Sequence, residues 1–229
     1  MELYPVIIDW IPGLPEIPYR NGIGQYEGVV MHYTASPGDS ARSEREYEAR
    51  TYQNAFVHEF VDPGEIIQVA NPSFIAYGAG PQANPRFIHI ELCHAKTQQQ
   101  FDVSYDKWCQ RAAFFLASRQ LGVSRAQPDG SGTVWGHFEV TRYLGGTSHT
   151  DPLDYIQSWG RSWNDTIKRV QSHYDQIVKG AEYAMNAEDA NKLIAFLSAA
   201  WNATVSQEAR DEFHRLANEL RKASGQPEE

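Results

Sequence analysis

Histidine is the residue type whose distribution first suggests chemistry in this sequence. Six of the eight histidines fall between positions 32 and 149, and they are His32, His58, His89, His94, His137 and His149. Imidazole binds transition metals and exchanges protons near neutral pH, so this distribution is compatible with metal binding or acid–base catalysis. A single histidine is more often a polar surface or core residue, so the elements that carry these side chains decide the interpretation.

Two segments predicted as strands place polar groups together on one face. Because alternate residues of a strand share a face, His32 in residues 28–34 points away from its immediate neighbours. In residues 87–92 the same alternation puts His89 and Glu91 on the face opposite the isoleucines. A carboxylate is costly to bury, so this face is expected to open into a polar cleft. An edge strand with one solvated face is the alternative.

A third segment supplies further donor groups. His137 follows a short predicted strand that begins at Val134, and the loop beyond it contributes His149 and Asp151. Catalytic zinc takes three protein ligands and keeps a fourth position open, and imidazoles with a carboxylate suit zinc better than magnesium or calcium. Glu139 lies two positions after His137, so on a strand it would share that face, either orienting a ligand or exposed to solvent.

The elements that would position these residues alternate in type. Residues 1–24 hold four of the twelve prolines and are expected to form an extended arm. Strands are predicted at residues 28–34, 55–61, 65–70 and 87–92 and from Val134 onward. Helices are predicted at residues 40–52, 105–121 and 153–179. The mixture indicates an α/β fold in which helices flank a central mixed β-sheet.

The sequence changes character near Gly180. Residues 1–179 are predicted as the main domain, and residues 180–229 as an appendage of two amphipathic helices capped by Asn186 and Ser206. The apolar stripes consist of Leu193, Ile194, Leu197 and Trp201 in the first helix and Phe213, Leu216 and Leu220 in the second. About fifty residues bury little core by themselves. This region is therefore expected to dock on the main domain, to form a homodimer with a second copy, or to bind a partner.

Composition limits the class of protein. The chain has 229 residues, 41% of them hydrophobic and 12% aromatic, as in a globular rather than a disordered protein. A formal net charge of −9 argues against binding nucleic acid by simple charge attraction. No stretch approaches the ~18 apolar residues of a membrane span, and the N-terminus lacks a secretory signal pattern, so synthesis in the cytoplasm is expected. The two cysteines, Cys93 and Cys109, exclude a disulfide scaffold and a four-cysteine zinc site.

Six motifs in one order resemble the type 2 N-acetylmuramoyl-L-alanine amidases, a zinc-dependent family related to peptidoglycan recognition proteins. They are residues 29–35, 55–58 with 62–68, 76–80, 88–92, 136–140 and 149–152. The resemblance implies a zinc ion held by His32, His137 and Asp151, with water at a fourth position. It also implies bacterial peptidoglycan as the substrate.

Further roles follow from the resemblance. Glu91 would take a proton from the attacking water and pass it to the departing amine of L-alanine. His149 stands where relatives carry a lysine that faces the developing oxyanion, and it is the second expected catalytic residue. His58, Tyr77 and His89 are expected to lie beside the substrate.

Three positions depart from the family pattern. Tyr77 and Gly78 replace a Trp-His pair, so one side of the substrate groove differs. His149 replaces a lysine two residues before the third ligand. Val57 occupies the place of a tyrosine that acts in catalysis in one phage branch, which moves the catalytic role onto Glu91.

The resemblance predicts a hydrolase that cleaves the bond between N-acetylmuramic acid and L-alanine. A missing signal peptide together with a C-terminal appendage favours a phage or prophage endolysin, released from the host cytoplasm to act at the cell wall. Residues 180–229 would then be a cell-wall-binding or dimerisation module. The alternatives are a cytosolic muropeptide-recycling amidase and a non-catalytic recognition module, which usually lacks the third ligand that Asp151 provides here. A structural zinc protein is less compatible, because structural zinc normally has four protein ligands.

Overall fold

The computed structural model describes residues 3–20, 22–181 and 187–227. The chain divides into two compact units, Met1–Val178 and Lys179–Glu229, so the division falls beside the predicted boundary at Gly180. Within the described ranges, no helix is both long and apolar enough to cross a membrane.

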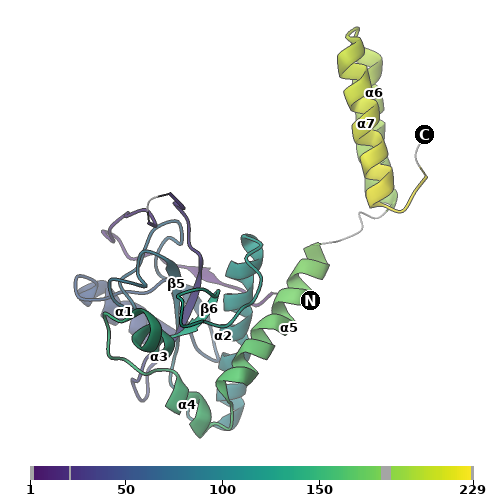
Figure 1. The fold of residues 1–229 in the computed structure, drawn as a ribbon. Helices are drawn as coiled ribbons and strands as arrows, with labels where there is room; N and C mark the ends of the chain where they lie inside the picture. Colours follow the sequence, from purple (N-terminus) through teal and green to yellow (C-terminus); the bar gives the residue numbers. More distant parts are fainter. Residues whose placement is uncertain (1–2, 21, 182–186, 228–229) are drawn as a thin grey trace. The chain divides into compact units, whose positions relative to one another are not determined.

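A six-stranded mixed sheet forms the centre of the first unit (Figure 1). Its strands are β1 (Ile7–Ile8), β2 (Gly28–Tyr33), β3 (Glu59–Val61), β4 (Ile66–Gln68), β5 (Phe87–Leu92) and β6 (Val134–Gly136), in the spatial order β1-β4-β3-β5-β2-β6. Strands β3, β5, β2 and β6 run parallel, whereas β4 is antiparallel to β3 and parallel to β1. The predicted α/β fold with a central mixed sheet and flanking helices is confirmed.

Helices lie on both faces of this sheet. They are α1 (Ala41–Thr51), α2 (Gln98–Ser118), α3 (His137–Glu139) with a π-helical turn at Val140–Leu144, α4 (Leu153–Ser158) and α5 (Trp163–Ala181). Helices α2, α4 and α5 pack on one face, whereas α1 and the π-helical turn pack on the other. Trp108 of α2 is fully buried against the sheet, and its Nε1 donates to the carbonyl of Ile90 at 3.0 Å. Helix α5 runs alongside α2 (Figure 1), where the hydroxyls of Tyr105 and Thr166 lie 2.9 Å apart. Burial of this apolar interface holds α2 against the sheet.

The opposite face of the sheet changes from apolar to polar along the strands. Val30 in β2 packs in a buried cluster with Trp135 of β6. Further along the same face lie His32 in β2 and Glu91 in β5, which are paired in register. Ligands of α/β proteins bind beyond the carboxyl ends of parallel strands, so the polar end is the expected site.

Helix α2 is longer than predicted. It begins at Gln98, where the side-chain oxygen of Thr97 accepts the N–H of Gln100 at 3.2 Å, rather than near Tyr105. Its first turn is glutamine-rich. The apolar spacing on which the prediction rested therefore starts only after the helix has begun.

The helix predicted over residues 153–179 is instead two helices, α4 and α5. Gly160 adopts a φ of 75°, which favours glycine, and Ser162 Oγ accepts the N–H of Asp165 at 3.2 Å where α5 begins. Ile156 before the break and Trp163 after it belong to the same core. The apolar stripe thus continues across the break between α4 and α5, so the sequence pattern did not indicate the break.

The hairpin strands are shorter than predicted. The carbonyl of His58 accepts the N–H groups of both Val69 and Ala70, at 2.8 and 3.4 Å. This bulge ends the regular pairing, so β3 begins only at Glu59 and β4 ends at Gln68. The N-terminal arm adds the strand β1, which is too short for a sequence pattern to reveal.

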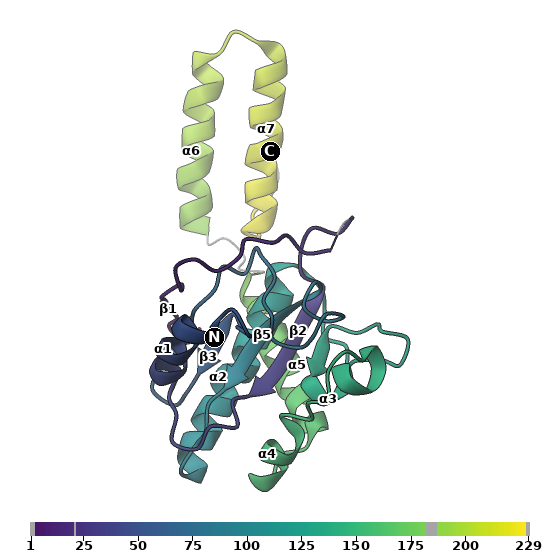
Figure 2. The ribbon, with the colours of Figure 1, turned by 90° about the vertical axis from the view of Figure 1, so that its left-hand side faces the viewer.

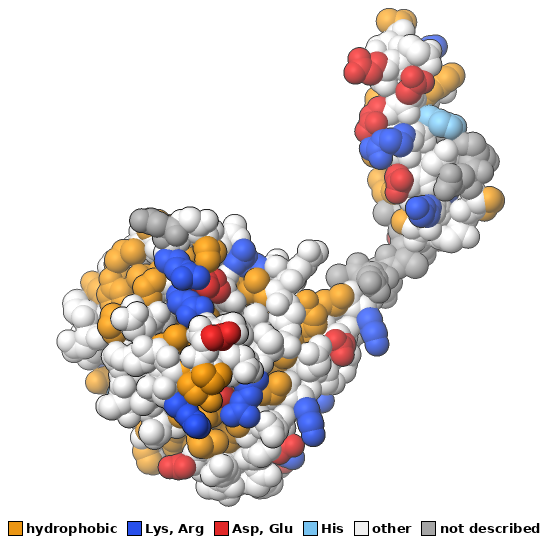
Figure 3. Space-filling model, in the orientation of Figure 1, with side chains coloured by type: hydrophobic (Ala, Val, Ile, Leu, Met, Phe, Trp, Pro, Cys, Tyr) orange, Lys and Arg blue, Asp and Glu red, His pale blue; other side chains and the backbone are white. Residues whose placement is uncertain are grey.

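The second unit is an antiparallel pair of helices, α6 (Ala187–Ala203) and α7 (Gln207–Ala223) (Figure 2). Ser206 caps α7 as predicted, since its side-chain oxygen accepts the N–H of Ala209 at 3.3 Å. The other predicted cap, Asn186, lies outside the described residues. Large apolar side chains stay exposed on this unit (Figure 3), and they include Leu193, Phe196, Trp201 and Val205.

Candidate active site

A cleft of about 990 Å³ opens in the first unit at the carboxyl ends of β2 and β5. Ligand pockets for small molecules measure roughly 300–1,000 Å³, so this cleft has room for an extended ligand. Its walls come from α1, from the turn around Tyr77 and from the loop before α4. The predicted site residues that line it are His32, Tyr77, Glu91, His137, His149 and Asp151.

Three of these residues converge at one point. Nδ1 of His32 lies 3.3 Å from Oδ2 of Asp151 and 3.1 Å from Nδ1 of His137. The same nitrogen of His137 lies 3.1 Å from Oδ1 of Asp151. One donor atom from each residue lies within 4.8 Å of the other two. Strand β2, the start of α3 and the loop before α4 thus bring together a set of donors that could hold one metal ion.

Burial and hydrogen bonding set the charges of this group. Burial lowers the pKa of His32 to about 4, although the hydrogen bond with Asp151 opposes the shift. Burial of Asp151 favours its neutral form, but hydrogen bonds from His137 and His32 outweigh this effect and hold its pKa well below the usual range. At neutral pH His32 is a neutral imidazole and Asp151 a carboxylate, the protonation states that metal binding requires.

Thr147 orients the ring of His137. Its Oγ1 lies 3.0 Å from Nε2 of His137, and with a metal ion on Nδ1 the Nε2–H group would donate to this hydroxyl. This threonine is a functional residue that the sequence analysis missed. A single threonine in a polar loop carries no spacing signal, and only the fold brings it to the histidine.

Glu139 holds the backbone turn that presents His137. Its side chain is buried and accepts the backbone N–H of Gly136 at 3.1 Å and Nε1–H of Trp163 at 3.0 Å. Residues 137–139 are helical, so the prediction that Glu139 shares a strand face with His137 is wrong. Because Glu139 caps the helical turn, it acts on the backbone rather than on the ligand ring.

His89 and His58 lie behind the donor group rather than in the cleft. Both side chains are fully buried, and neither lines the cleft. Nδ1 of His89 lies 3.1 Å from Nε2 of His32, and the backbone N–H of His89 donates to Nδ1 of His58 at 2.9 Å. Burial lowers the pKa of both, to about 4 for His58. The structure therefore separates both residues from the substrate contact expected of them and places His89 against a metal-site residue.

Gly78 makes room for this arrangement. A Cβ at Gly78 would lie 2.9 Å from the ring of His89, which is too close for non-bonded atoms. Tyr77 beside it does line the cleft. The departure from the family pattern at this turn thus allows its backbone to approach the buried histidine.

Glu91 borders the cleft next to His32. Their pairing across β5 and β2 sets the two side chains side by side on one face. Oε2 of Glu91 is buried and has no hydrogen-bond partner among the described residues. Burial, and then the negative charge of Asp151, raise the pKa of Glu91 well above its usual range. A carboxyl group with a raised pKa can accept and return a proton near neutral pH.

His149 lies at the open side of the donor group. Its side chain is 70% exposed, and Nδ1 is 3.8 Å from Oδ1 of Asp151. The ring stacks on that of His137 with 4.8 Å between centroids. This position lets a ligand in the cleft reach the imidazole from solvent.

Comparison with known proteins assigns the family. The sequence profile of the N-acetylmuramoyl-L-alanine amidases matches residues 23–154, a region that contains His32, Glu91, His137 and Asp151. The chain belongs to this family.

Bacterial members of the amidase family resemble this chain over most of its length. It is 37% identical over 211 residues to the protein Ami of Listeria monocytogenes, which covers 92% of this chain and 23% of Ami. It is 39% identical over 166 residues to the bifunctional autolysin of Staphylococcus aureus, covering 72% of this chain and 13% of the autolysin. The chain therefore spans less than a quarter of either relative.

A solved structure of similar sequence has the same fold. The Staphylococcus aureus hydrolase AmiA, in complex with its ligand, superposes with a TM-score of 0.72 at 37% identity. The superposition covers 76% of this chain and 85% of the AmiA chain. The fold of the amidase unit is thus shared with that hydrolase.

The donor group of this amidase-family chain fits zinc. Tetrahedral coordination at ~2.1 Å places ligand atoms about 3.4 Å apart. The Nδ1 atoms of His32 and His137 lie 3.1 Å apart, and each lies 3.1–3.3 Å from one oxygen of Asp151, Oδ2 for His32 and Oδ1 for His137. Two imidazoles, one carboxylate and an open side toward the cleft also match the pattern of catalytic rather than structural zinc.

Proposed function

We propose that this chain hydrolyses the amide bond between N-acetylmuramic acid and the L-alanine of peptidoglycan stem peptides, with one zinc ion as cofactor. The observation that carries the proposal is the convergence of His32, His137 and Asp151 beside Glu91 in one open cleft. The family match supports the reaction, and so does the likeness to a protein named an autolysin.

Three residues would hold the metal, and two others would orient the rings of the two histidine ligands. His32, His137 and Asp151 provide the ligand atoms, while His89 and Thr147 contact the distal ring nitrogens of the two histidines. When bound, zinc supplies Lewis-acid chemistry that polarises the scissile carbonyl and makes water more acidic.

Glu91 would move the proton during hydrolysis. Its carboxylate takes a proton from the attacking water and then passes it to the nitrogen of L-alanine as the C–N bond breaks. His149 is exposed beside Asp151. It would donate a hydrogen bond to the carbonyl oxygen on which negative charge develops.

A non-catalytic recognition module explains fewer of these features. Recognition requires a cleft but neither a third metal donor nor an unpartnered carboxylate beside it. Asp151 completes the donor group here, and Glu91 has an oxygen without a hydrogen-bond partner among the described residues. Both observations favour the enzyme.

We place the proposed activity at the bacterial cell wall. The relatives that are 37–39% identical are bacterial proteins, one of them named an autolysin. This likeness favours turnover of a bacterium's own wall. The endolysin setting expected from the sequence stays a prediction.

Hydrolysis of purified Gram-positive peptidoglycan tests the proposal. We expect new N-terminal alanine without new reducing sugar ends, loss of this release in a chelator, and recovery when zinc is added. Glu91→Gln should lower turnover by about 10²–10⁴-fold while the variant still binds zinc. Wall binding without any new ends would overturn the hydrolase and leave the recognition module.

A further inference from the structure

The second unit buries little of its own apolar surface. Among the described residues of α6 and α7, only Ala190 and Ala217 are buried. Leu193 and Phe196 of α6 remain 46% and 74% exposed. Two short helices contain too little core to be stable by themselves, so a further surface is needed to cover these side chains.

One apolar stripe of α6 faces α7, which lies beside it (Figure 2). Leu197 and Trp201 line one cavity together with Phe213 and Ala217 of α7. The guanidinium of Arg210 in α7 lies over the ring of Trp201, 4.7 Å from its centroid. The members of this stripe are Ala190, Ile194, Leu197 and Trp201.

A second apolar stripe of α6 lies to one side of the contact with α7. We call it the Phe196 stripe, and its members are Leu193, Phe196, Ala200 and Ala203. Steps of three, four and three residues are those of a heptad seam between two helices. At ~100° per residue, the Phe196 stripe lies roughly 110° around the helix from the stripe that faces α7. Helix α6 therefore has the pattern of a helix with two helical neighbours.

The Phe196 stripe lies in an uncharged part of α6. Residues 193–205 contain no acidic residue, lysine, arginine or histidine. The charged side chains of this helix, Glu188, Asp189 and Lys192, all lie in its first six residues. Interfaces between identical chains are more apolar than other protein surfaces. A second copy of α6 therefore suits this stripe better than a cell-wall polymer, which is recognised through hydrogen bonds and charges.

The second unit also exposes the apolar area that a dimer needs. Trp201 and Val205 are 41% and 97% exposed in addition to Leu193 and Phe196. With ~200 Å² for each bare side chain, the four expose on the order of 500 Å² in one chain. That is more than half of the ~800 Å² that each chain buries in a stable interface, where polar groups at the rim supply the rest.

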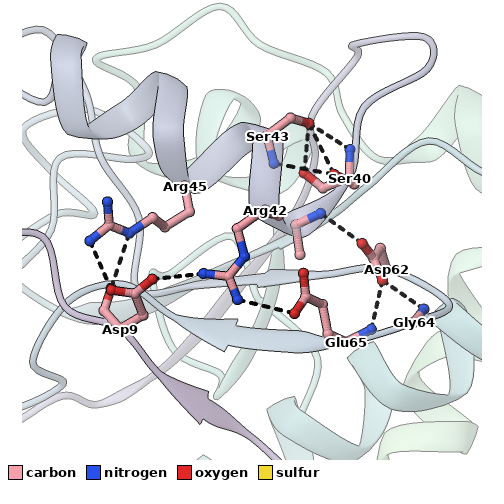
Figure 4. A network of polar contacts seen from close by, with 9 residues as sticks. Asp9, Ser40, Arg42, Ser43, Arg45, Asp62, Gly64 and Glu65 are labelled. Atoms are coloured by element: carbon pink, nitrogen blue, oxygen red, sulfur yellow. Dashed lines mark hydrogen bonds and ion pairs between the residues drawn. The ribbon is translucent and has the colours of Figure 1, made fainter.

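Another group of exposed apolar side chains, on the N-terminal arm, is less suited to docking. Ile8 and Trp10 are 67% and 45% exposed. Between them, Asp9 binds Arg42 and Arg45 of α1, each at 2.8 Å (Figure 4). A partner seated on the arm would have to remove water from these ion pairs, which is costly. The Phe196 stripe is interrupted by no such charges.

We propose that the full chain forms a homodimer in which the Phe196 stripes of two copies pack antiparallel around a two-fold axis at Phe196. A two-fold axis brings the same surface of both chains together. It sets Phe196 beside its own counterpart and Leu193 beside Ala199 and Ala200 of the partner subunit, so that large side chains pack against small ones. No residue of the stripe lines the cleft, so the dimer does not depend on the proposed function.

Charge selects the antiparallel direction. If the two copies of α6 ran parallel, Glu188 and Asp189 would meet their own counterparts, and like charges reduce affinity. In the antiparallel pair both lie opposite the uncharged end of the partner's α6. The same axis directs the acidic first turn of α7, with Glu208, toward the basic last turn of the partner's α7, with Arg221 and Lys222.

Sedimentation equilibrium of the full-length chain tests the inference. At about 50 μM we expect twice the 25.9 kDa mass of one chain. Phe196→Glu should raise the dissociation constant of the dimer by about 30-fold or more, because aromatic residues at the centre of an interface contribute most to affinity. Ala195→Glu is the matched control. Ala195 is an exposed neighbour on the face away from both stripes, so this variant should stay dimeric.

Disulfide formation tests the direction of the helices without disturbing the stripe. Cys93 and Cys109 are buried, so an introduced cysteine is the accessible thiol. Chains with Asp189→Cys, mixed with chains that carry Ala203→Cys, should link under mild oxidation because the axis sets these positions opposite each other. Either variant alone should stay unlinked, since its two copies lie ~21 Å apart along the helices. Linkage of each variant with itself, and not with the other, would overturn the antiparallel pair.

A monomeric wild-type chain would overturn the dimer and leave the proposed hydrolase intact. If Phe196→Glu then reduced sedimentation with insoluble peptidoglycan, the stripe would be a wall-binding face instead. A wild-type dimer that Phe196→Glu leaves unchanged would show that another surface joins the two copies. A dimer that depends on Phe196 but hydrolyses no peptidoglycan would support this inference and overturn the proposed function.

Discussion

The Nε2 atom of His32 lies 3.1 Å from the Nδ1 atom of His89, and both rings are buried. With a metal ion on Nδ1 of His32, Nε2–H of this ring would donate to Nδ1 of His89. The backbone N–H of His89 donates to Nδ1 of His58, which leaves Nε2–H of His58 to donate to the carbonyl of Phe74 at 3.0 Å. This series of contacts orients the ring of His32, a residue of the candidate metal site.

We expect His89→Ala to weaken zinc binding by about 10–100-fold, because His32 would lose the acceptor that orients its ring. Competition with a chromophoric chelator measures the dissociation constant. At saturating zinc the variant should recover most of its turnover, since His89 does not line the cleft.

Two further variants make this expectation specific. His89→Asn retains an acceptor oxygen near the position of Nδ1 and should keep most of the zinc affinity. His214→Ala removes an exposed histidine from α7 and should change nothing. An unaltered dissociation constant in a correctly folded His89→Ala variant would show that the contact with His32 is incidental.

Glu48 gives the fold a stability that depends on pH. Burial raises its pKa well above the usual value in the folded chain. Between the unfolded and folded pKa values the folded state binds more protons, so this residue makes stability fall as pH rises through that window. The cost is fully present above the folded pKa and absent below the unfolded one.

We therefore expect Glu48→Gln to raise the free energy of unfolding at neutral pH by about 1–3 kcal/mol, since the amide keeps an acceptor for Val57 without a buried charge. The gain should shrink toward zero at about pH 4, near the unfolded pKa of glutamate. Urea denaturation of both proteins at the two pH values measures it. A difference of equal size at both would show that charge is not the cause.

Strand alternation correctly predicted which side chains share a face of the sheet, but not which of them reach the cleft. His89 and Glu91 share a face, as the period of two requires, yet only Glu91 reaches the cleft. His89 lies one alternation earlier, where the backbone at Gly78 approaches its ring closely enough to exclude any side chain there. Which turn covers which strand depends on tertiary packing, so the sequence pattern could not separate a cleft residue from a buried one.

The candidate metal site was predicted from the family resemblance rather than from strand alternation. Alternation alone indicated His32, whereas the set that includes His137 and Asp151 came from the resemblance of several motifs in one order. Thr147 was not predicted at all, and the face expected for Glu139 was wrong, since their contacts arise from a loop and a helical turn that have no periodic pattern. The contacts that orient the ligand side chains thus could not be predicted without the three-dimensional structure.

His149 offers a test of charge at the open side of the site. We expect His149→Ala to lower kcat by about tenfold or more with little change in KM, because the donor would act on charge that develops during the reaction. We expect His149→Lys to remain active to higher pH than the wild type, since lysine stays charged where histidine becomes neutral. Superimposable pH–rate profiles would mean that His149 acts as a neutral imidazole.

The two-helix unit should be dispensable for the chemistry. Every described residue that lines the cleft belongs to Met1–Val178. A chain lacking residues 182–229 should hydrolyse a soluble muramoyl peptide with kcat/KM within about twofold of the full-length value, as expected for independent sites. Phe196 is exposed on this unit, and we expect it to contact another surface. Sedimentation with insoluble wall measures wall binding, and the molecular mass in solution measures self-association. We expect truncation, and Phe196→Glu in the full chain, to weaken one of these two properties. If both properties survive in both variants, the unit neither targets the wall nor joins two copies.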